Sequence, residues 1–260
     1  MPTISVAGVN LDYRSIPGTG PTLVFLHEGL GSQGLWRSFP DTIAAATGLP
    51  AVIYSRHGHG WSDPMTGPRT PRFMHDEALI SLPELLEKLD IGDPILIGHS
   101  DGASIALIHA GAGPWSVRAI VAIAPHVFVE EEAIIGVDAA RRAFEEDVLA
   151  AKMAKHHHDA AATFYSWHDI WKSPGFRDWN LEGDIAGIEC PLLLIQCAGD
   201  EYGTSRQLDA VEAAVAGPVE RVWLEDCGHS AHLDQPDAVA AAVIQFVKSQ
   251  SASGRGGGHT

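Results

Sequence analysis

The stretch from Pro94 to Ala110 reads PILIGHSDGASIALIHA. An apolar run of strand type ends in a Gly-x-Ser-x-Gly pattern, and a helix-like segment follows at once, which is the context of a nucleophile elbow. Gly98 and Gly102 suit such a turn, because it forces unusual backbone angles on the serine and leaves no room for side chains two residues away. The pattern predicts that Ser100 is a catalytic nucleophile. The alternative is a glycine-rich turn in which the serine only caps the helix.

Similar apolar runs recur on both sides of this stretch. They are short and nearly continuous, as in a parallel sheet covered on both faces, and they alternate with segments of helical spacing. This alternation predicts the α/β class, with a doubly wound, mostly parallel sheet that begins with an antiparallel hairpin turning near Gly8. The runs cover residues 22–27, 51–55, 94–99, 117–124, 191–196 and 219–224, and the clearest helical segments cover 73–89, 204–216 and 236–248.

One long segment interrupts the alternation. Residues 126–189 carry no strong strand signal and are too many for a simple loop in a compact domain. We therefore expect an inserted helical cap at 126–189, on a core formed by residues 1–125 and 190–248. The Ser- and Gly-rich end, 249–260, is expected to be a disordered tail.

The overall charge excludes some classes of partner. The chain of 260 residues carries 33 acidic residues against 17 Lys and Arg, which gives a net charge of −16. Such a chain should be repelled by nucleic acid and by anionic membranes, so we expect neither as a partner. A small-molecule substrate is the partner that the sequence favours, while the oligomeric state stays open.

The cysteines and the first residues bear on location. Cys190, Cys197 and Cys227 are an odd number without paired spacing, so we interpret them as small buried side chains in a reducing compartment. The first residues lack the pattern of a signal peptide, and no apolar run approaches the roughly 20 residues of a membrane helix. We expect a cytoplasmic protein.

A serine nucleophile needs a general base and an acid that orients it. In this architecture the chain order is serine, acid, histidine. His229 follows the run at 219–224 and is the expected base, with His232 as its competitor. Asp200 follows the run at 191–196 and is the expected acid, with Glu201 as the alternative.

Two backbone N–H groups should form an oxyanion hole. One belongs to the residue after the nucleophile, which is Asp101, and the other to the loop after an earlier strand. That loop reads HEGLGS at 27–32, and its small residues let the backbone approach a substrate closely. We assign the second donor to Gly29, with Leu30 as the alternative.

These motifs together resemble the α/β-hydrolase superfamily, above all its compact, capped members, often labelled esterases, lactonases or carbon–carbon bond hydrolases. The resemblance spans Thr22 to about Val247. It implies Ser100 as nucleophile, Asp200 as acid and His229 as base. Serine at the elbow differs from the dehalogenase and epoxide hydrolase branches, which use Asp there. The matching motifs are HEGLGS at 27–32, RHGHGWS at 56–62, GHSDG at 98–102, and the Gly-Asp and Gly-His pairs at 199–200 and 228–229.

The sequence departs from the family pattern at two charged positions. Glu28 stands where the family commonly has glycine, and it either points away from the pocket or favours cationic or neutral substrates. Arg56 stands where the family usually has Asp, and an acidic neighbour such as Glu28 could pair with it.

Aromatic residues are the expected walls of the substrate pocket. Trp36 and Tyr202 lie beside the oxyanion and acid loops, and Trp167 and Trp171 lie in the expected cap. The alternative for the cap aromatics is a small core of their own. His156-His157-His158 is better explained as a solvated helix surface than as a metal site, because adjacent helical residues point in different directions. No metal or cofactor is expected.

The function that these residues favour is hydrolysis of a small carboxylic ester or lactone through an acyl-enzyme on Ser100. A first alternative is cleavage of a carbon–carbon bond in a diketone-type substrate by the same three residues. A second, from another class, is a non-catalytic receptor that keeps the fold and binds a small ligand.

Overall fold

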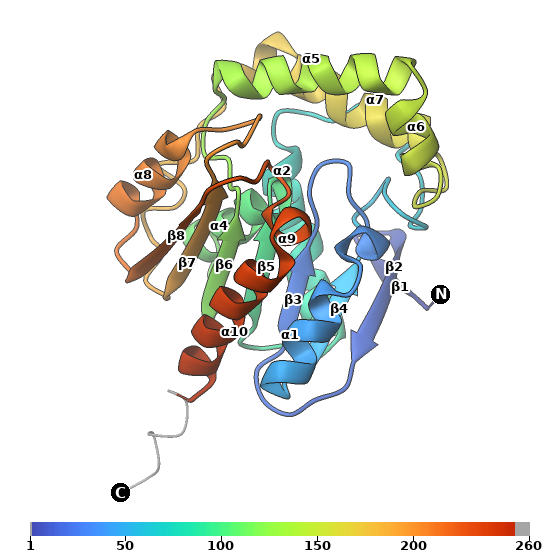
Figure 1. Cartoon of the computed structure of the whole chain (residues 1–260). Helices are drawn as coiled ribbons and strands as arrows, with labels where there is room; N and C mark the ends of the chain where they lie inside the picture. Colours follow the sequence, from blue (N-terminus) through green and yellow to red (C-terminus); the bar gives the residue numbers. More distant parts are fainter. Residues whose placement is uncertain (1, 253–260) are drawn as a thin grey trace, which may run out of the picture.

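The computed structural model describes residues 2–252 and has an eight-stranded sheet at its centre (Figure 1). The strand order is β1-β2-β4-β3-β5-β6-β7-β8, and all neighbours from β4 to β8 pair in parallel. The predicted α/β class and mostly parallel sheet are confirmed. The strands are β1 (Thr3–Val6), β2 (Val9–Ile16), β3 (Leu23–Leu26), β4 (Ala51–Tyr54), β5 (Ile95–His99), β6 (Ala119–Ile123), β7 (Leu192–Cys197) and β8 (Val219–Leu224).

The N-terminal hairpin forms as predicted. Strands β1 and β2 pair antiparallel around a two-residue turn in which Ala7 has φ 50° and Gly8 has φ 81°. Two consecutive positive φ angles match the right-handed twist of the flanking strands. Strand β2 then pairs antiparallel with β4 and extends the parallel part of the sheet.

Helices cover both faces of the sheet, and the alternation of side chains along the buried strands explains why. In β3, Leu23 and Phe25 pack toward the face of α1 and α10, whereas Val24 and Leu26 pack toward the other face, with α3 and α4. The strands from β3 to β7 thus each have apolar residues for both layers. The helices of these layers are α1 (Phe39–Thr47), α2 (Phe73–Asp76), the π-helical turn η2 (Glu77–Ser81), α3 (Leu82–Lys88), α4 (Asp101–Ala112), α8 (Ser205–Ala214) and α10 (Pro236–Ala252); two short helices, η1 (Gln33–Trp36) and α9 (Ala231–Asp234), lie in loops.

The segment between β6 and β7 contains the helices that we call the cap: α5 (Glu131–Glu145), α6 (Val148–Met153) and α7 (Ala160–Trp171), followed by the short η3 (Pro174–Phe176). They lie across one end of the sheet, at the top of Figure 1. A single antiparallel bridge between Phe128 and Asn180 joins the two stems of this insertion. The apolar residues of α7 pack into the same cluster as the sheet face below.

Two expectations about the chain need correction. Helix α10 continues to Ala252, so the first residues of the expected disordered tail are helical, and the rest of that tail lies outside the described residues. Cys197 and Cys227 form a disulfide, so their interpretation as unpaired side chains is wrong. The reason is topological: β7 and β8 are neighbours, so Cys197 at the end of β7 and Cys227 in the segment after β8, 30 positions apart, come to a Cα–Cα distance of 5.4 Å.

This pairing also bears on location. Disulfides persist mainly in oxidising compartments, which weighs against the reducing surroundings that we expected. The cytoplasmic location stays a prediction. Within residues 2–252, no helix combines the length and the apolar character needed to cross a membrane.

Candidate active site

Ser100 sits at the sharp turn between β5 and α4. Its φ of 54° and ψ of −120° are strained for a residue with a side chain, and such strain is typical of functional sites. The two glycines are required by space: a Cβ on Gly102 would lie 2.0 Å from the carbonyl oxygen of Leu26, and one on Gly98 would lie 2.4 Å from that of Gly102. The turn therefore has the geometry of a nucleophile elbow, and Ser100 lines a cavity under the cap.

His229 and Asp200 come together beside this turn. His229 Nδ1 donates to Asp200 Oδ1 at 2.9 Å, and the backbone N–H of Tyr202 donates to the same oxygen, also at 2.9 Å. The amide of Gln196 donates to Asp200 Oδ2 at 3.2 Å. With its Nδ1 proton bound in this way, His229 keeps Nε2 free to accept a proton, as a general base requires.

The charges of the pair support these roles. Burial lowers the pKa of His229, but the neighbouring Asp200 carboxylate outweighs burial and leaves that pKa above its ordinary value. Burial conversely raises the pKa of Asp200, but His229 outweighs it and lowers the pKa of Asp200 to about 2. Asp200 is thus ionised at neutral pH and stabilises the imidazolium that forms when His229 takes up a proton.

The competing residues occupy other positions. Glu201 Oε2 accepts from the backbone N–H of His229 at 3.1 Å and does not reach the imidazole. His232 is buried against the rings of Trp36 and Phe39, with centroid distances of 4.9 and 5.6 Å. Burial, and then the nearby His99, lower the pKa of His232 to about 3. The geometry therefore favours Asp200 and His229 as acid and base.

The loop after β3 presents the backbone of Gly29 to the same cavity. Arg56 Nη2 donates to the carbonyl oxygen of Glu28 at 2.9 Å, and His27 Nδ1 donates to the same oxygen at 2.7 Å. Because a trans peptide is planar, fixing this carbonyl fixes the N–H of Gly29 in the opposite direction. A Cβ on Gly29 would lie 2.3 Å from the Trp167 ring, so only glycine fits here.

Asp101 supplies the second candidate donor. Among the described residues, neither the N–H of Asp101 nor that of Gly29 has an acceptor within the protein. Gly29 lines the cavity, and Asp101 directly follows Ser100, which also lines it. Leu30, the alternative donor, also lines the cavity, and its carbonyl accepts from His157 Nε2 at 3.0 Å. His157 is buried and also accepts from Gly60 N, so the expectation of a solvated histidine is wrong at this position.

Arg56 has a different partner from the one we expected. Its Nη2 lies 3.8 Å from Asp101 Oδ2, and both side chains are almost fully buried. It contacts the carbonyl of Glu28 rather than the carboxylate. Burial raises the pKa of the Asp101 carboxyl, and Arg56 opposes that rise. Arg56 therefore links the two segments that carry the candidate oxyanion donors.

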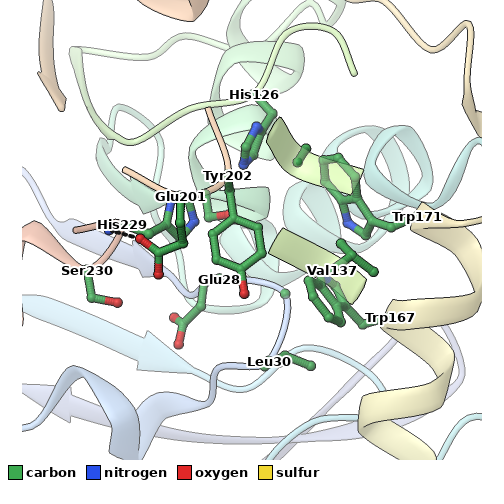
Figure 2. Close-up of a pocket in the computed structure, with 13 residues that line it drawn as sticks. Glu28, Leu30, His126, Val137, Trp167, Trp171, Glu201, Tyr202, His229 and Ser230 are labelled. Atoms are coloured by element: carbon green, nitrogen blue, oxygen red, sulfur yellow. Dashed lines mark hydrogen bonds between the residues drawn. The ribbon is translucent and has the colours of Figure 1, made fainter. Parts of the chain in front are cut away.

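The cavity has a volume of about 190 Å³ and lies between the ends of the strands and the cap (Figure 2). Three of the four expected substrate-binding residues, Trp167, Trp171 and Tyr202, line it, and their contact with a substrate stays a prediction. The fourth, Trp36, lies elsewhere: it is buried and stacks on Phe39 at 5.9 Å. The lining consists of Glu28, Gly29, Leu30, Ser100, His126, Ala133, Val137, Trp167, Trp171, Glu201, Tyr202, His229 and Ser230.

His126 is the lining residue that sequence reasoning missed most clearly. It follows β6, and its ring lies 5.6 Å from that of His229 and 5.1 Å from that of Trp171. Burial, and then the charge of His229, lower the pKa of His126 to about 3. The signal was present in the sequence, since ligands of α/β sheets bind at the carboxyl ends of the strands.

The arrangement can be compared with known proteins. The family model of the alpha/beta hydrolase family matches residues 23–242. An sn-1-specific diacylglycerol lipase of Danio rerio is 27% identical over 92% of this chain and 83% of its own length. Epoxide hydrolase 2 of Siraitia grosvenorii is 31% identical over 56% of this chain and 45% of its own length. A thermophilic esterase from Thermogutta terrifontis shares the fold, with a TM-score of 0.76 at 16% identity, over 96% of this chain and 98% of that one.

The match to the family model covers most of the chain, and the relatives include hydrolases along nearly its full length. The elbow at Ser100 and the neighbouring pair of His229 and Asp200 are where this family's chemistry would be expected. The chain belongs to the alpha/beta hydrolase family and is an enzyme of the hydrolase type.

Proposed function

We propose that this enzyme hydrolyses a carboxylic ester or lactone of a small molecule through an acyl-enzyme on Ser100. One observation carries the proposal: the strained Ser100 lines the same cavity as His229, whose Nδ1 is held by Asp200 at 2.9 Å. This is the constellation that activates a serine hydroxyl, and it uses only groups of the chain itself.

In the first half of the reaction, Ser100 Oγ attacks the carbonyl carbon of the substrate. His229 Nε2 accepts the hydroxyl proton as the new C–O bond forms, and Asp200 stabilises the resulting imidazolium. The negative charge moves to the carbonyl oxygen, where the N–H groups of Gly29 and Asp101 stabilise it. Because Arg56 and His27 already fix the Glu28 carbonyl, little reorganisation is needed when this charge appears.

The intermediate then collapses. The bond from the carbonyl carbon to the leaving oxygen breaks, and His229 gives its proton to that oxygen, which releases an alcohol. Water repeats the sequence: His229 takes a proton from it, the hydroxide adds to the acyl-enzyme, and the proton returns to Ser100 Oγ as the carboxylic acid leaves. In a lactone the alcohol and the acid belong to one product.

The proposal is tested by labelling and turnover together. Wild type and Ser100→Ala are incubated with a fluorophosphonate and analysed by intact mass, and both are assayed with short-chain nitrophenyl esters. We expect a single adduct and ester turnover for the wild type, and neither for the variant. An adduct that persists on Ser100→Ala, or turnover that survives the substitution, would refute the role of Ser100.

A further inference from the structure

Two carboxylates line the cavity on the side of the base. Glu28 Oε2 lies 3.5 Å from His99 Nδ1, and the side chain is 25% exposed. Glu201 is exposed and contacts the backbone N–H of His229 through its carboxylate. Figure 2 shows both carboxylates next to His229 and Ser230, from the loops after β3, β7 and β8.

Glu28 is charged in this position. Burial alone would raise its pKa, but His99 and then His27 outweigh burial and leave the pKa of Glu28 well below its ordinary value. Within the described part of the chain, no Lys or Arg side-chain nitrogen lies within 4.0 Å of either Glu28 or Glu201. No lysine or arginine of the described residues therefore balances the negative charge on this side of the cavity, and the nearest basic side chain is His99, 3.5 Å from Glu28.

The other lining residues do not balance it either. Of the residues that the structure describes, no lysine or arginine lines the cavity, and His126 is neutral because burial lowers its pKa to about 3. The Nδ1 atom of His126 is buried and has no hydrogen-bond partner among the described residues. A buried polar group without a partner beside a cavity indicates a site shaped for a bound molecule.

The opposite side of the cavity is aromatic and apolar. Trp167 and Trp171 come from α7 and Val137 from α5, and the Tyr202 ring stands between them and His229, 6.3 Å from Trp167 and 4.7 Å from His229 (Figure 2). Aromatic faces attract cations through their quadrupole, and aromatic cages are a common way to bind quaternary ammonium groups. The cavity thus has an acidic half beside the base and an apolar half under the cap.

The mechanism orients a substrate in this cavity. His229 protonates the leaving oxygen, so the alcohol half of an ester must lie beside His229, where Glu28 and Glu201 also lie. We propose that the substrate carries a cationic group, of the ammonium type, in its alcohol half, while its acyl half occupies the apolar side. This inference rests on the proposed ester hydrolysis and names the class of ester.

Matched thioesters test the charge and its location. Acetylthiocholine is compared with S-(3,3-dimethylbutyl) thioacetate, in which a carbon atom replaces the nitrogen. A second pair places the cation in the acyl half: S-ethyl thioesters of betaine and of 3,3-dimethylbutanoic acid. Each kcat/KM is divided by the spontaneous rate of hydrolysis in the same buffer. We expect the first cationic ester to exceed its neutral partner by about tenfold or more, as for a charge near an opposite charge, and the second pair to show no such preference.

Three variants connect the preference to its residues. Glu28→Gln and Glu201→Gln should each reduce the preference for acetylthiocholine several-fold, whereas Glu189→Gln, an exposed control with the same change of charge, should leave it unchanged. The ratio is taken within each variant, so a general loss of activity cancels. Equal rates for the first pair in the wild type, a preference that neither Glu28→Gln nor Glu201→Gln alters, or a preference only in the second pair would each overturn the inference.

A binding measurement separates this inference from the proposed hydrolysis. Calorimetric titration compares choline with 3,3-dimethylbutan-1-ol, its neutral isostere. We expect choline to bind about tenfold or more tightly to the wild type and to lose this advantage in Glu28→Gln. If no ester is hydrolysed but choline is still preferred, the hydrolysis proposal fails and the cation site stands. If the two alcohols bind equally, the cation site is refuted even where esters are hydrolysed.

Discussion

The disulfide between Cys197 and Cys227 should contribute a large share of the stability of the fold. Replacing both by alanine frees the segments after β7 and β8 and leaves Cys190, the remaining and half-buried cysteine, unpaired as before. The bond closes a loop over a sequence separation of 30 residues. In the chain-entropy model, such a loop lowers the entropy of the unfolded chain by about 12 cal/mol/K, or about 4 kcal/mol at 25 °C.

This magnitude is readily measured. In a domain of this size about 4 kcal/mol corresponds to a fall in Tm of roughly 7–15 °C. Urea unfolding of the double variant should show a lower midpoint, and a reducing agent should lower the midpoint of the wild type to about the same value. The double variant itself should not respond to the reductant, and Cys190→Ala should behave as the wild type does.

The same experiment bears on catalysis. Asp200 lies three residues after Cys197 and His229 two residues after Cys227, so the bond ties together the segments that carry the proposed acid and the proposed base. Turnover in the double variant should fall along with stability. If the double variant is as stable as the wild type, or if the reductant leaves the urea midpoint of the wild type unchanged, the disulfide does not contribute to the stability of the fold.

The remaining predictions concern the reaction itself. With nitrophenyl esters as substrates, His229→Ala should lower kcat/KM by several orders of magnitude. Asp200→Asn should lower it by about 10⁴, because the amide holds the imidazole of His229 in the wrong tautomer. A mild effect of Asp200→Asn would transfer the acid role to another carboxylate. A protonated base cannot accept the serine proton, so log kcat/KM should rise with pH through the pKa of His229, which the Asp200 carboxylate holds above the ordinary 6.5; a rise centred well below 6.5 would contradict this. Arg56→Leu should lower kcat by about 10²–10³ and change KM less, because one oxyanion donor is no longer oriented. Steady-state kinetics gives kcat and KM separately, which distinguishes this effect from a loss of fold. An unchanged kcat would refute the positioning role of Arg56.

Much of the fold could be predicted because its signals are local. Every buried strand is a short apolar run, and the elbow at Ser100 needs only five residues to show its turn. The order of serine, acid and histidine follows from the sheet, since the segments after β5, β7 and β8 meet at one edge. Asp200 and His229 could therefore be proposed as acid and base from their positions after strands, and the structure brings His229 Nδ1 to 2.9 Å from Asp200 Oδ1.

What could not be predicted depends on contacts between distant segments. The spacing of Cys197 and Cys227 carries no sign of their pairing, which depends on β7 and β8 being neighbours. Trp36 stands next to the oxyanion loop in the sequence, but its helical turn directs the ring into the core beside Phe39. The same holds for Arg56, because its partners depend on which distant segments pack around it: the guanidinium donates to the carbonyl of Glu28 and lies 3.8 Å from Asp101 Oδ2.

The placement of the tryptophans gives the enzyme a built-in optical signal. Trp167 and Trp171 are buried and line the cavity, whereas Trp61, Trp115 and Trp223 are exposed and lie outside its lining. Acrylamide should therefore quench the exposed indoles first and leave a blue-shifted emission dominated by buried ones. A ligand that enters the cavity should change this residual emission and not the quenched part. Intrinsic fluorescence can then report ligand binding in the cavity in a screen of small molecules, including molecules that the enzyme binds but does not hydrolyse.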